Sequence, residues 1–316
     1  MIPAYRDLPR HESGIRSAWG IFGATDQIGT MNLLTRETVA AAAAEVVTGK
    51  VFALNADLTE FDPPLYSRQR ASHVLLPEED DAGFDETLTF NPQSSSQWDS
   101  LAHVAGASGR FYNGATPCEI RDEGRNGIVG VARRGIAGRG VLLDFEAVAR
   151  ERDDGYHPGR PLAVTVDDLE RCLTRAGTGW KDGDIAILHT GFLPWYRRQP
   201  AGQRKAMTDS RQLTAAGLEH SEEMAAYLWD SRLAAVVSDN PAVEVWPPGR
   251  GAEHGPFGFL HHALLGFLGI MLGELWKLDA LAADCRQDGR YTAFVTSAPL
   301  PIARGVSSPA NAVAVK

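Results

Sequence analysis

The residues with the clearest chemical potential lie in one short stretch, Gln93-Ser-Ser-Ser-Gln-Trp-Asp-Ser-Leu-Ala-His103. Four of its side chains can bind a metal or move a proton: Gln93, Gln97, Asp99 and His103. The last three share one parity, so an extended backbone would point them to the same side. Polar groups gathered in this way indicate a metal or acid–base site. The alternative is a polar loop followed by an ordinary strand, because metal-site signatures usually contain more His or Cys.

A second group of candidate ligands lies late in the chain, where His261-His262 is followed by Glu274. The leucines between them have helical spacing, so we expect a helix over His261–Trp276. If the fold brings Asp99, one of these histidines and Glu274 together, they form an oxygen and nitrogen site suited to zinc or manganese. With nothing nearby, two adjacent histidines would instead be capping or surface groups.

Short apolar strands and helices alternate along the chain and must position these residues. We expect strands at Val51–Leu58, Val141–Asp144, Asp184–His189, Ala234–Ser238 and Tyr291–Thr296, and helices at Arg36–Thr48, Thr165–Ala176 and Leu218–Leu233. The helix at Thr165 opens on a capping box. The segment Pro63–Gly83 is expected to be a loop, and Leu88–Phe90 to be extended. This alternation predicts an α/β domain with a mixed sheet.

Composition and charge exclude several classes of protein. The 316 residues are 44% hydrophobic and 22% charged, which is typical of a globular chain that can bury a substantial core. The net charge of −9, with scattered Lys and Arg, disfavours a nucleic-acid partner. The glycine-rich segment Gly124–Gly140 lacks the dinucleotide fingerprint, and neither a Walker A motif nor Gly-x-Ser-x-Gly occurs.

Cysteine usage and hydropathy predict the compartment. Cys118, Cys172 and Cys285 are far apart and form neither a Cys-x-x-Cys pair nor a disulfide framework, so we expect a reducing cytoplasm. The N-terminus lacks the pattern of a signal peptide. The apolar run Ala263–Leu275 is too short and too rich in glycine to cross a bilayer, which takes about 20 apolar residues. We therefore expect no membrane partner.

Two other histidines are open to interpretation. His189 ends an apolar strand before Thr190-Gly191, and a core hydrogen bond is favoured over a place in the pocket. His220 lies in polar surroundings, and we expect it at the surface.

The chain resembles the putative cyclase family, which includes bacterial kynurenine formamidase and isatin hydrolase. The family signature His-x-Gly-Thr-His-x-Asp-x-Pro-x-His aligns with Gln93-x-Ser95-Ser96-Gln97-x-Asp99-x-Leu101-x-His103. Ordered matches continue over most of the chain: Val141-Leu-Leu-Asp144, Leu188-His-Thr-Gly191, Val237-Ser-Asp-Asn-Pro241, and Leu260-His261 to Gly273-Glu274-Leu275. Trp19-Gly20 and Phe111-Tyr-Asn-Gly114 resemble a longer branch of the family, which also carries Gln-Ser-x-x-Gln-Trp-Asp.

This resemblance implies a single domain over residues 1–316, with a mixed, partly barrel-like sheet flanked by helices. Residues 1–50 would be an N-terminal extension packed on that domain, and the protein would be a homodimer or a higher homo-oligomer. Gln93, Gln97 and Asp99 occupy the positions of metal ligands. Two family histidines are thus replaced by glutamine, which binds through a weaker amide oxygen, so these residues act as ligands or orient the ligands.

The resemblance also implies roles for the later residues. A histidine and Glu274 would complete the site for one divalent ion, manganese or zinc. His262 has the spacing of short family members, whereas His261 fits the longer branch and the pattern Leu-His-x-x-Leu-Leu, so His261 is favoured. His103 would be the proton carrier.

The expected function is metal-dependent hydrolysis of a small cyclic amide, lactone or N-acyl arylamine. A catalytic metal lowers the pKa of bound water from about 15.7 to near 7, which makes it a nucleophile for a carbonyl carbon. Trp98, Tyr112 and Phe22 are candidate walls for the substrate, with ordinary core packing as the alternative for each. Two other functions remain open: a non-hydrolytic cyclase or lyase with weak or no metal, and a non-enzymatic relative that binds a small molecule.

Overall fold

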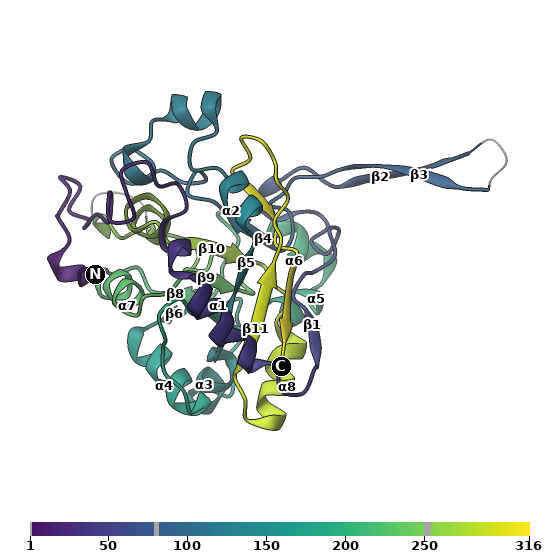
Figure 1. The fold of residues 1–316 in the computed structure, drawn as a ribbon. Helices are drawn as coiled ribbons and strands as arrows, with labels where there is room; N and C mark the ends of the chain where they lie inside the picture. The colour runs from purple at the N-terminus through teal and green to yellow at the C-terminus, as the bar shows by residue number, and fades with distance from the viewer. Residues whose placement is uncertain (1, 79–81, 250–253) are drawn as a thin grey trace.

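A nine-stranded mixed sheet organises the chain in the computed structural model, which describes residues 2–78, 82–249 and 254–316 (Figure 1). The strands are β1 Val51–Ala53, β2 Ser72–Pro77, β3 Phe84–Thr89, β4 Gln97–Asp99, β5 Ile136–Asp144, β6 Ala163–Val164, β7 Ile185–His189, β8 Gly217–Leu218, β9 Ala235–Ser238, β10 Met271–Glu274, β11 Thr292–Ser297, β12 Ser307–Pro309 and β13 Ala312–Val315. The order in the large sheet is β1-β13-β11-β5-β7-β9-β10-β4-β12. This sheet curls into a half-barrel, which confirms the predicted mixed α/β fold.

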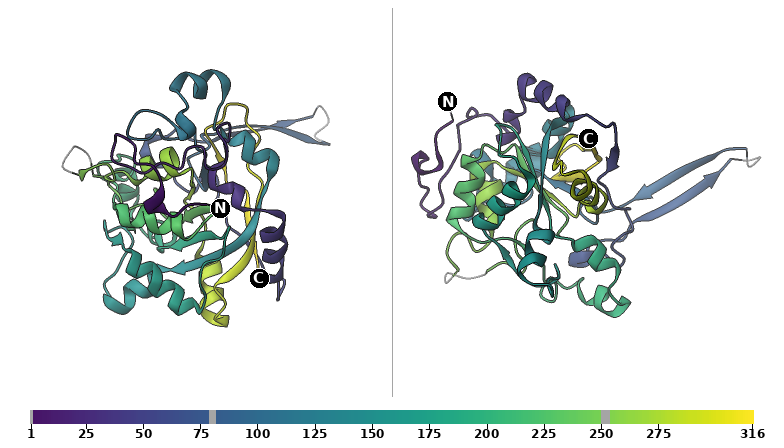
Figure 2. Two further views of the ribbon diagram at one scale, coloured as in Figure 1. Left: turned by 60° about the vertical axis from the view of Figure 1, so that its left-hand side comes forward. Right: turned by 90° about the horizontal axis from the view of Figure 1, so that it is seen from below.

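Helices flank this sheet, as the sequence predicts. They are α1 Arg36–Ala42, α2 Ile128–Arg134, α3 Phe145–Arg152, α4 Val166–Ala176, α5 Phe192–Arg197, α6 Ala201–Ala206, α7 Glu222–Asp230 and α8 Asp279–Asp288. Figures 1 and 2 show α3, α4 and α7 grouped beside the central strands, with α8 next to the C-terminus. The predicted capping box is present, because the Thr165 hydroxyl accepts a hydrogen bond from Asp168 N and the Asp168 side chain accepts one from Thr165 N.

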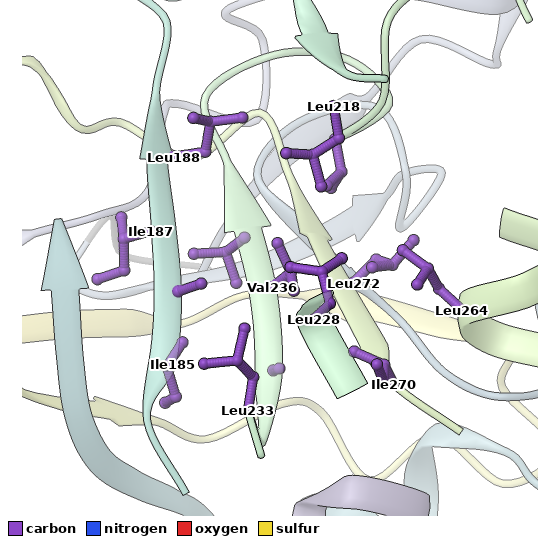
Figure 3. Packing of buried hydrophobic residues seen from close by; sticks show 14 of the residues in the cluster. Ile185, Ile187, Leu188, Leu218, Leu228, Leu233, Val236, Leu264, Ile270 and Leu272 are labelled. Carbon is purple, nitrogen blue, oxygen red and sulfur yellow. The ribbon is translucent and has the colours of Figure 1, made fainter. Parts of the chain in front are cut away.

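The centre of the sheet is parallel and buried on both faces. Strands β5, β7, β9 and β10 run parallel to one another, whereas β11 beside β5 and β4 beside β10 are antiparallel to them. Every residue of β7 and β9 is buried, as expected for strands covered on both sides. Figure 3 shows Val236 and Leu272, which are paired on adjacent strands, on the side of Leu228 and Leu264 from outside the sheet, whereas the register places Ile187 of β7 on the other face. This core fixes the ends of the strands that carry the polar residues.

The expected helix over His261–Trp276 is wrong in its second half. A short π-helix, His262–Leu268, ends at Gly269, whose positive φ of 68° suits glycine, and β10 follows. Glu274 therefore lies on a strand. An unbroken apolar run has no periodicity that separates a buried strand from a buried helix, which explains the error.

Two other boundaries differ from prediction. Leu218 lies in β8, and α7 begins only at Glu222, because the Ser221 hydroxyl caps it by accepting a hydrogen bond from Met224 N. The strand expected over Val51–Leu58 is limited to the three residues of β1. In both cases a local apolar pattern extends beyond the hydrogen-bonded element.

The first strand of a hairpin, β2, replaces the part of the expected loop Pro63–Gly83 that runs from Ser72 to Pro77. Strands β2 and β3 pair antiparallel from Ser72↔Thr89 to Pro77↔Phe84 and project away from the rest of the chain (Figures 1 and 2). The loop prediction at residues 79–81 falls outside the described residues. The extended conformation predicted near Leu88 is confirmed.

The N-terminal segment packs on the sheet and on α7. Tyr5 N donates to Asp230 Oδ1 at 2.6 Å, Trp229 Nε1 donates to Pro3 O at 3.0 Å, and the Thr30 hydroxyl donates to Ala234 O at 2.8 Å. Within the described ranges, no helix has the length and hydrophobicity required to cross a bilayer.

Candidate functional site

Two strands from distant parts of the sequence place the candidate ligands side by side. Strands β4 and β10 are antiparallel neighbours, with Gln97 paired to Glu274 and Asp99 paired to Leu272. Because side chains alternate along a strand, Gln97 and Asp99 project to one face of β4. The structure therefore brings Asp99 close to Glu274, as the metal site expected from the sequence requires.

Asp99, His261 and Glu274 converge on one point, and we call them the carboxylate–histidine cluster. Each offers one ligand atom, and these atoms all lie within 4.8 Å of one another. His261 Nε2 is 3.3 Å from Glu274 Oε1 and 3.8 Å from Asp99 Oδ2, and all three residues are buried. His262 turns away, with Nδ1 2.6 Å from Ala105 O. The structure thus brings His261, not His262, to the two carboxylates.

Glu244 completes the surroundings of His261 and was not identified from the sequence. Its carboxylate accepts from Nδ1 of His261 and from the backbone N–H groups of Leu260 and His261 at 2.5 and 3.0 Å. His220, which was expected at the surface, has its Nε2 2.7 Å from Glu244 Oε2. Burial lowers the pKa of His261, but the carboxylates of Glu244 and Glu274 outweigh it and raise that pKa to about 10.

The two glutamines present their amide nitrogens to the carboxylates. Gln97 Nε2 donates to Glu274 Oε2 at 2.5 Å, and Gln93 Nε2 donates to Asp99 Oδ1 at 2.9 Å. Such bonds hold carboxylates in place and favour the orienting role over direct ligation. Gln97 Oε1 and Asp99 Oδ2 are buried and have no hydrogen-bond partner among the described residues.

His103 reaches the cluster through a turn. Strand β4 ends at Asp99, and His103 N donates to Ser100 O at 3.0 Å, so the continuous extended segment expected from residue parity is wrong. The side chain nevertheless returns to the site, with Nδ1 2.9 Å from Gln93 Nε2 and Nε2 3.9 Å from Asp99 Oδ2. Burial lowers the pKa of His103 despite the opposing charge of Asp99, which keeps the imidazole neutral and able to accept a proton.

The electrostatics of the cluster fit a divalent cation. Burial and the charge of Asp99 raise the pKa of Glu274 to about 7. A buried acceptor left without a donor costs about 1–3 kcal/mol, and Asp99 Oδ2 and Gln97 Oε1 are two such atoms. A cation held by Asp99, His261 and Glu274 would stabilise both carboxylates and satisfy Asp99 Oδ2. One nitrogen and two carboxylate ligands suit zinc or manganese.

A cavity of about 670 Å³ opens beside the cluster. Its wall includes His262, Trp246 and Phe259, and the Phe259 ring stacks on His261 with centroids 4.6 Å apart. Residues 105–107, shortly after His103, line the same cavity. Tyr66 contacts Trp246 edge-on at 5.2 Å. These aromatic residues were not identified from the sequence, because they come from segments that only the fold brings together.

The three aromatic residues predicted from the sequence lie in other surroundings. Trp98 projects from the face of β4 opposite Asp99, and its ring packs edge-on against Trp276 at 5.1 Å. The Tyr112 hydroxyl donates to Asp26 Oδ2 at 3.1 Å. Phe22 packs against Trp229 at 6.4 Å. These contacts match the alternative of core packing.

Comparisons with known proteins agree with this architecture. A family model described as Putative cyclase matches residues 26–245. A crystal structure described as a novel cyclase is 32% identical, with a TM-score of 0.81 over 95% of this chain and 99% of that chain. Isatin hydrolase A from Ralstonia solanacearum is 20% identical, with a TM-score of 0.59 over 89% of this chain and 97% of that one. Isatin hydrolase A from Labrenzia aggregata bound to benzyl benzoate is 16% identical, with a TM-score of 0.59 over 88% and 97%. A search among curated proteins gave no match.

Proposed function

This chain belongs to the putative cyclase family, and we propose that it is a metal-dependent hydrolase of small molecules. The observation that carries the proposal is the convergence of Asp99, His261 and Glu274 in a buried site where Asp99 Oδ2 has no hydrogen-bond partner. The hydrolases with the same fold support this class of reaction but, at their low identity, leave the substrate to be determined.

We assign one divalent ion to Asp99, His261 and Glu274, with Gln93 and Gln97 as donors that orient the carboxylates. When bound, the ion would supply a Lewis acid that acidifies water and polarises a carbonyl group. Manganese and zinc both suit two carboxylate ligands and one imidazole. Both glutamines point their amide nitrogens, which cannot bind a cation, at the carboxylates. The ion would therefore have fewer protein ligands than the family signature provides.

His103 is the proposed general base and acid. Its neutral imidazole accepts a proton from the attacking water as the new C–O bond forms, and returns it to the leaving nitrogen or oxygen as the C–N or C–O bond breaks. The Gln93 amide beside Nδ1 holds the ring near Asp99. His103 is therefore placed to move a proton at the edge of the cluster.

The proposed substrate is a small cyclic amide, lactone or N-acyl arylamine. The cavity beside the cluster provides Phe259 and Trp246 as flat apolar walls, which suit a planar ring next to the reacting carbonyl. These two residues take the role that the sequence analysis assigned to Trp98, Tyr112 and Phe22.

Metal analysis joined to an activity screen tests the function. Metal-free protein is titrated with Mn²⁺ or Zn²⁺, and we expect about one ion per chain and hydrolysis of at least one of the three substrate classes, lost on chelation. Asp85→Asn, on the exposed strand β3, is the matched control for removing an aspartate charge and should behave as wild type. Absence of specific metal binding, or hydrolysis that survives complete chelation, would contradict the proposal.

One observation favours a second candidate function. Both glutamine amides already donate to the cluster carboxylates, so these carboxylates are partly stabilised without a cation. His103 and Asp99 could then act as an acid–base pair in a cyclisation or elimination. Turnover that persists in metal-free protein and disappears in His103→Ala would support this alternative.

We further infer that the protein acts in a reducing compartment, the cytoplasm. Cys118, Cys172 and Cys285 are free thiols, and burial raises the pKa of Cys285 to about 12, which keeps that thiol unreactive. A homodimer or higher homo-oligomer, which the family resemblance implies, also remains part of the proposal.

A further inference from the structure

The imidazole of His262 has no part in the proposed reaction, although it lies in the wall of the cavity. Its Nδ1 is 2.6 Å from Ala105 O, on the loop that forms the opposite part of the same wall. The Phe259 ring meets the His262 ring edge-on, with centroids 5.0 Å apart, while it stacks on His261. These contacts hold the His262 ring in one orientation beside the candidate metal site.

The contact with Ala105 fixes the position of the proton on the neutral ring. A carbonyl oxygen can only accept a hydrogen bond, so Nδ1 is the donor. The other nitrogen, Nε2, then carries a lone pair and acts as an acceptor. Within the described ranges Nε2 has no hydrogen-bond partner, and unlike Asp99 Oδ2 it is not sealed from solvent. His262 therefore offers a free acceptor at the cavity wall.

The rest of the described wall offers almost nothing to a polar group. Most of its residues are glycine, alanine or proline, and Phe259 is apolar. Trp246 has a polar side-chain atom, but its Nε1 already donates to Ser210 O at 2.9 Å. Among the described lining residues, Nε2 of His262 is thus the single side-chain atom left to form a hydrogen bond. Few polar groups in an apolar cavity set the orientation and the selectivity of a ligand.

We propose that His262 is a specificity-determining residue, and that the cavity selects flat ring compounds that carry a hydrogen-bond donor, an N–H or an O–H, for Nε2. The rings of Phe259 and Trp246 provide flat apolar surface for such a ring. A ring without the donor would cover Nε2 and leave it unpaired, and sites of this kind reject analogues that lack the matching group. The inference rests on the proposed function, because it takes this cavity as the place of the substrate.

Ring compounds without a carbonyl group test the inference with no need for hydrolysis. Indole carries a ring N–H, benzofuran has an oxygen atom in its place, and 1-methylindole has the nitrogen without the hydrogen. At pH 8, where imidazole is neutral, calorimetric titration of the full-length protein should give a Kd for indole at least about 10-fold below those of the other two. 2-Naphthol and 2-methoxynaphthalene form the matching pair for a ring O–H. A preference in either pair supports the acceptor role, and the pair that shows it identifies the donor.

Two substitutions at position 262 separate ligand binding from the contact with Ala105. In His262→Asn the amide nitrogen can still donate to Ala105 O, but the shorter side chain leaves the place of Nε2 empty, so indole and benzofuran should bind equally. In His262→Gln the longer side chain reaches that place with an acceptor oxygen and should keep most of the preference for indole. His73→Asn, on the exposed strand β2, is the matched control and should bind as the wild type does.

Binding and turnover report on the two proposals separately. A protein that prefers indole to benzofuran but hydrolyses none of the three substrate classes would support the acceptor role and contradict the hydrolase. Hydrolysis by a protein that binds indole and benzofuran equally would contradict the acceptor role alone. Absence of binding by all of the probes would also overturn the inference. So would a preference for indole that persists unchanged in His262→Asn, with a thermal midpoint showing that this variant is folded.

Discussion

Two buried clusters of the same residue types lie in this fold. The carboxylate–histidine cluster contains Asp99, His261 and Glu274, whereas a second group, which we call the strand-end cluster, contains Asp144, His189 and Asp239. The strand-end residues lie at or just beyond the ends of β5, β7 and β9. Composition and burial do not distinguish the two clusters.

The hydrogen bonds do distinguish them. Asp239 accepts from Thr190 N and Gly191 N at 2.7 Å and from Phe192 N at 2.9 Å, and Asp144 accepts two bonds from Arg286 at 2.6 and 2.7 Å. Both oxygens of each of these carboxylates accept hydrogen bonds. In the carboxylate–histidine cluster, by contrast, Asp99 Oδ2 has no donor, and Phe259, which stacks on His261, lines a cavity.

The two clusters differ in whether their buried oxygen atoms have hydrogen-bond donors. Unsatisfied oxygen acceptors, rather than residue types, therefore identify the candidate metal site. A buried carboxylate surrounded by N–H groups serves the fold, because its charge is already stabilised. A carboxylate such as Glu274, whose pKa is raised by burial and by the neighbouring charge of Asp99, is suited to bind a cation or a proton, and Asp99 Oδ2 beside it has no donor. This agrees with the sequence-based preference for a core hydrogen bond at His189, whose Nδ1 lies 3.1 Å from Asp144 Oδ1.

The largest expected effect comes from Asp99→Asn. It removes a charged ligand but keeps the shape of the side chain, so metal content should fall from about one ion per chain to near zero. Hydrolysis should fall by at least about 10³-fold, the value of several kcal/mol of transition-state stabilisation. Mass spectrometry of the bound metal and kcat/KM measure both effects. Wild-type metal content in the variant would remove the distinction between the clusters.

His103→Ala should lower kcat by about 10²–10⁴-fold, because it removes the general acid–base group. Metal content should stay at the wild-type level, since His103 lies outside the three proposed ligands. His189→Gln is the comparison in the strand-end cluster and should leave kcat of the folded fraction nearly unchanged. Near-normal turnover in His103→Ala would reject the proton-transfer role.

Asp239→Asn should reverse this pattern. The new amide group would face the N–H donors of Thr190, Gly191 and Phe192, so the free energy of unfolding should fall by about 3 kcal/mol, roughly 150-fold in the folding equilibrium. Urea denaturation measures this loss, and metal stoichiometry of the folded protein should not change. A loss of metal without a loss of stability would show that the strand-end cluster belongs to the site.

Glu244→Gln should have an intermediate effect on the metal site alone. Glu244 orients His261 through Nδ1, and loss of such a partner typically weakens metal affinity by about 10–100-fold. Isothermal titration of the metal-free protein gives the affinity directly. Glu219→Gln, beside His220 in sequence, is a control that should bind metal as the wild type does.

The sequence predicts the central strands well because they are short apolar runs with clear ends. It fails at Glu274, where a continuous apolar run hides the change from helix to strand at Gly269. It also fails at the hairpin of β2 and β3, because every residue of both strands is exposed and burial does not alternate along them. Elements without a distinguishing burial pattern are those that local sequence cannot assign.

The site was predictable to the extent that its residues follow a family motif. The motif pointed to Asp99, His103, His261 and Glu274, whose side chains the structure brings together, and strand alternation alone already places Trp98 on the opposite face from Asp99. Glu244 and Phe259 could not be found, because each acts through contacts with His261 that depend on tertiary packing. No spacing rule connects them to the ligands.

The smallest expected effect is on the pH dependence of stability in the metal-free protein. The pKa of Glu274 is raised from 4.5 to about 7 in the folded state, so its contribution to stability is complete below pH 4.5 and is lost as the pH rises through 7. Asp144 has the opposite sign: its pKa is lowered, so its contribution is present above 3.8 and is lost in acid. Between pH 4.5 and 7 the metal-free chain should therefore lose about 2.5 kcal/mol of unfolding free energy through Glu274. Urea denaturation across this window should show an unfolding free energy that falls with pH in the wild type and stays flat in Glu274→Gln.

Added metal should abolish this loss of unfolding free energy, because a cation stabilises the ionised carboxylate. A slope unchanged by both the substitution and the metal would place its origin outside the carboxylate–histidine cluster.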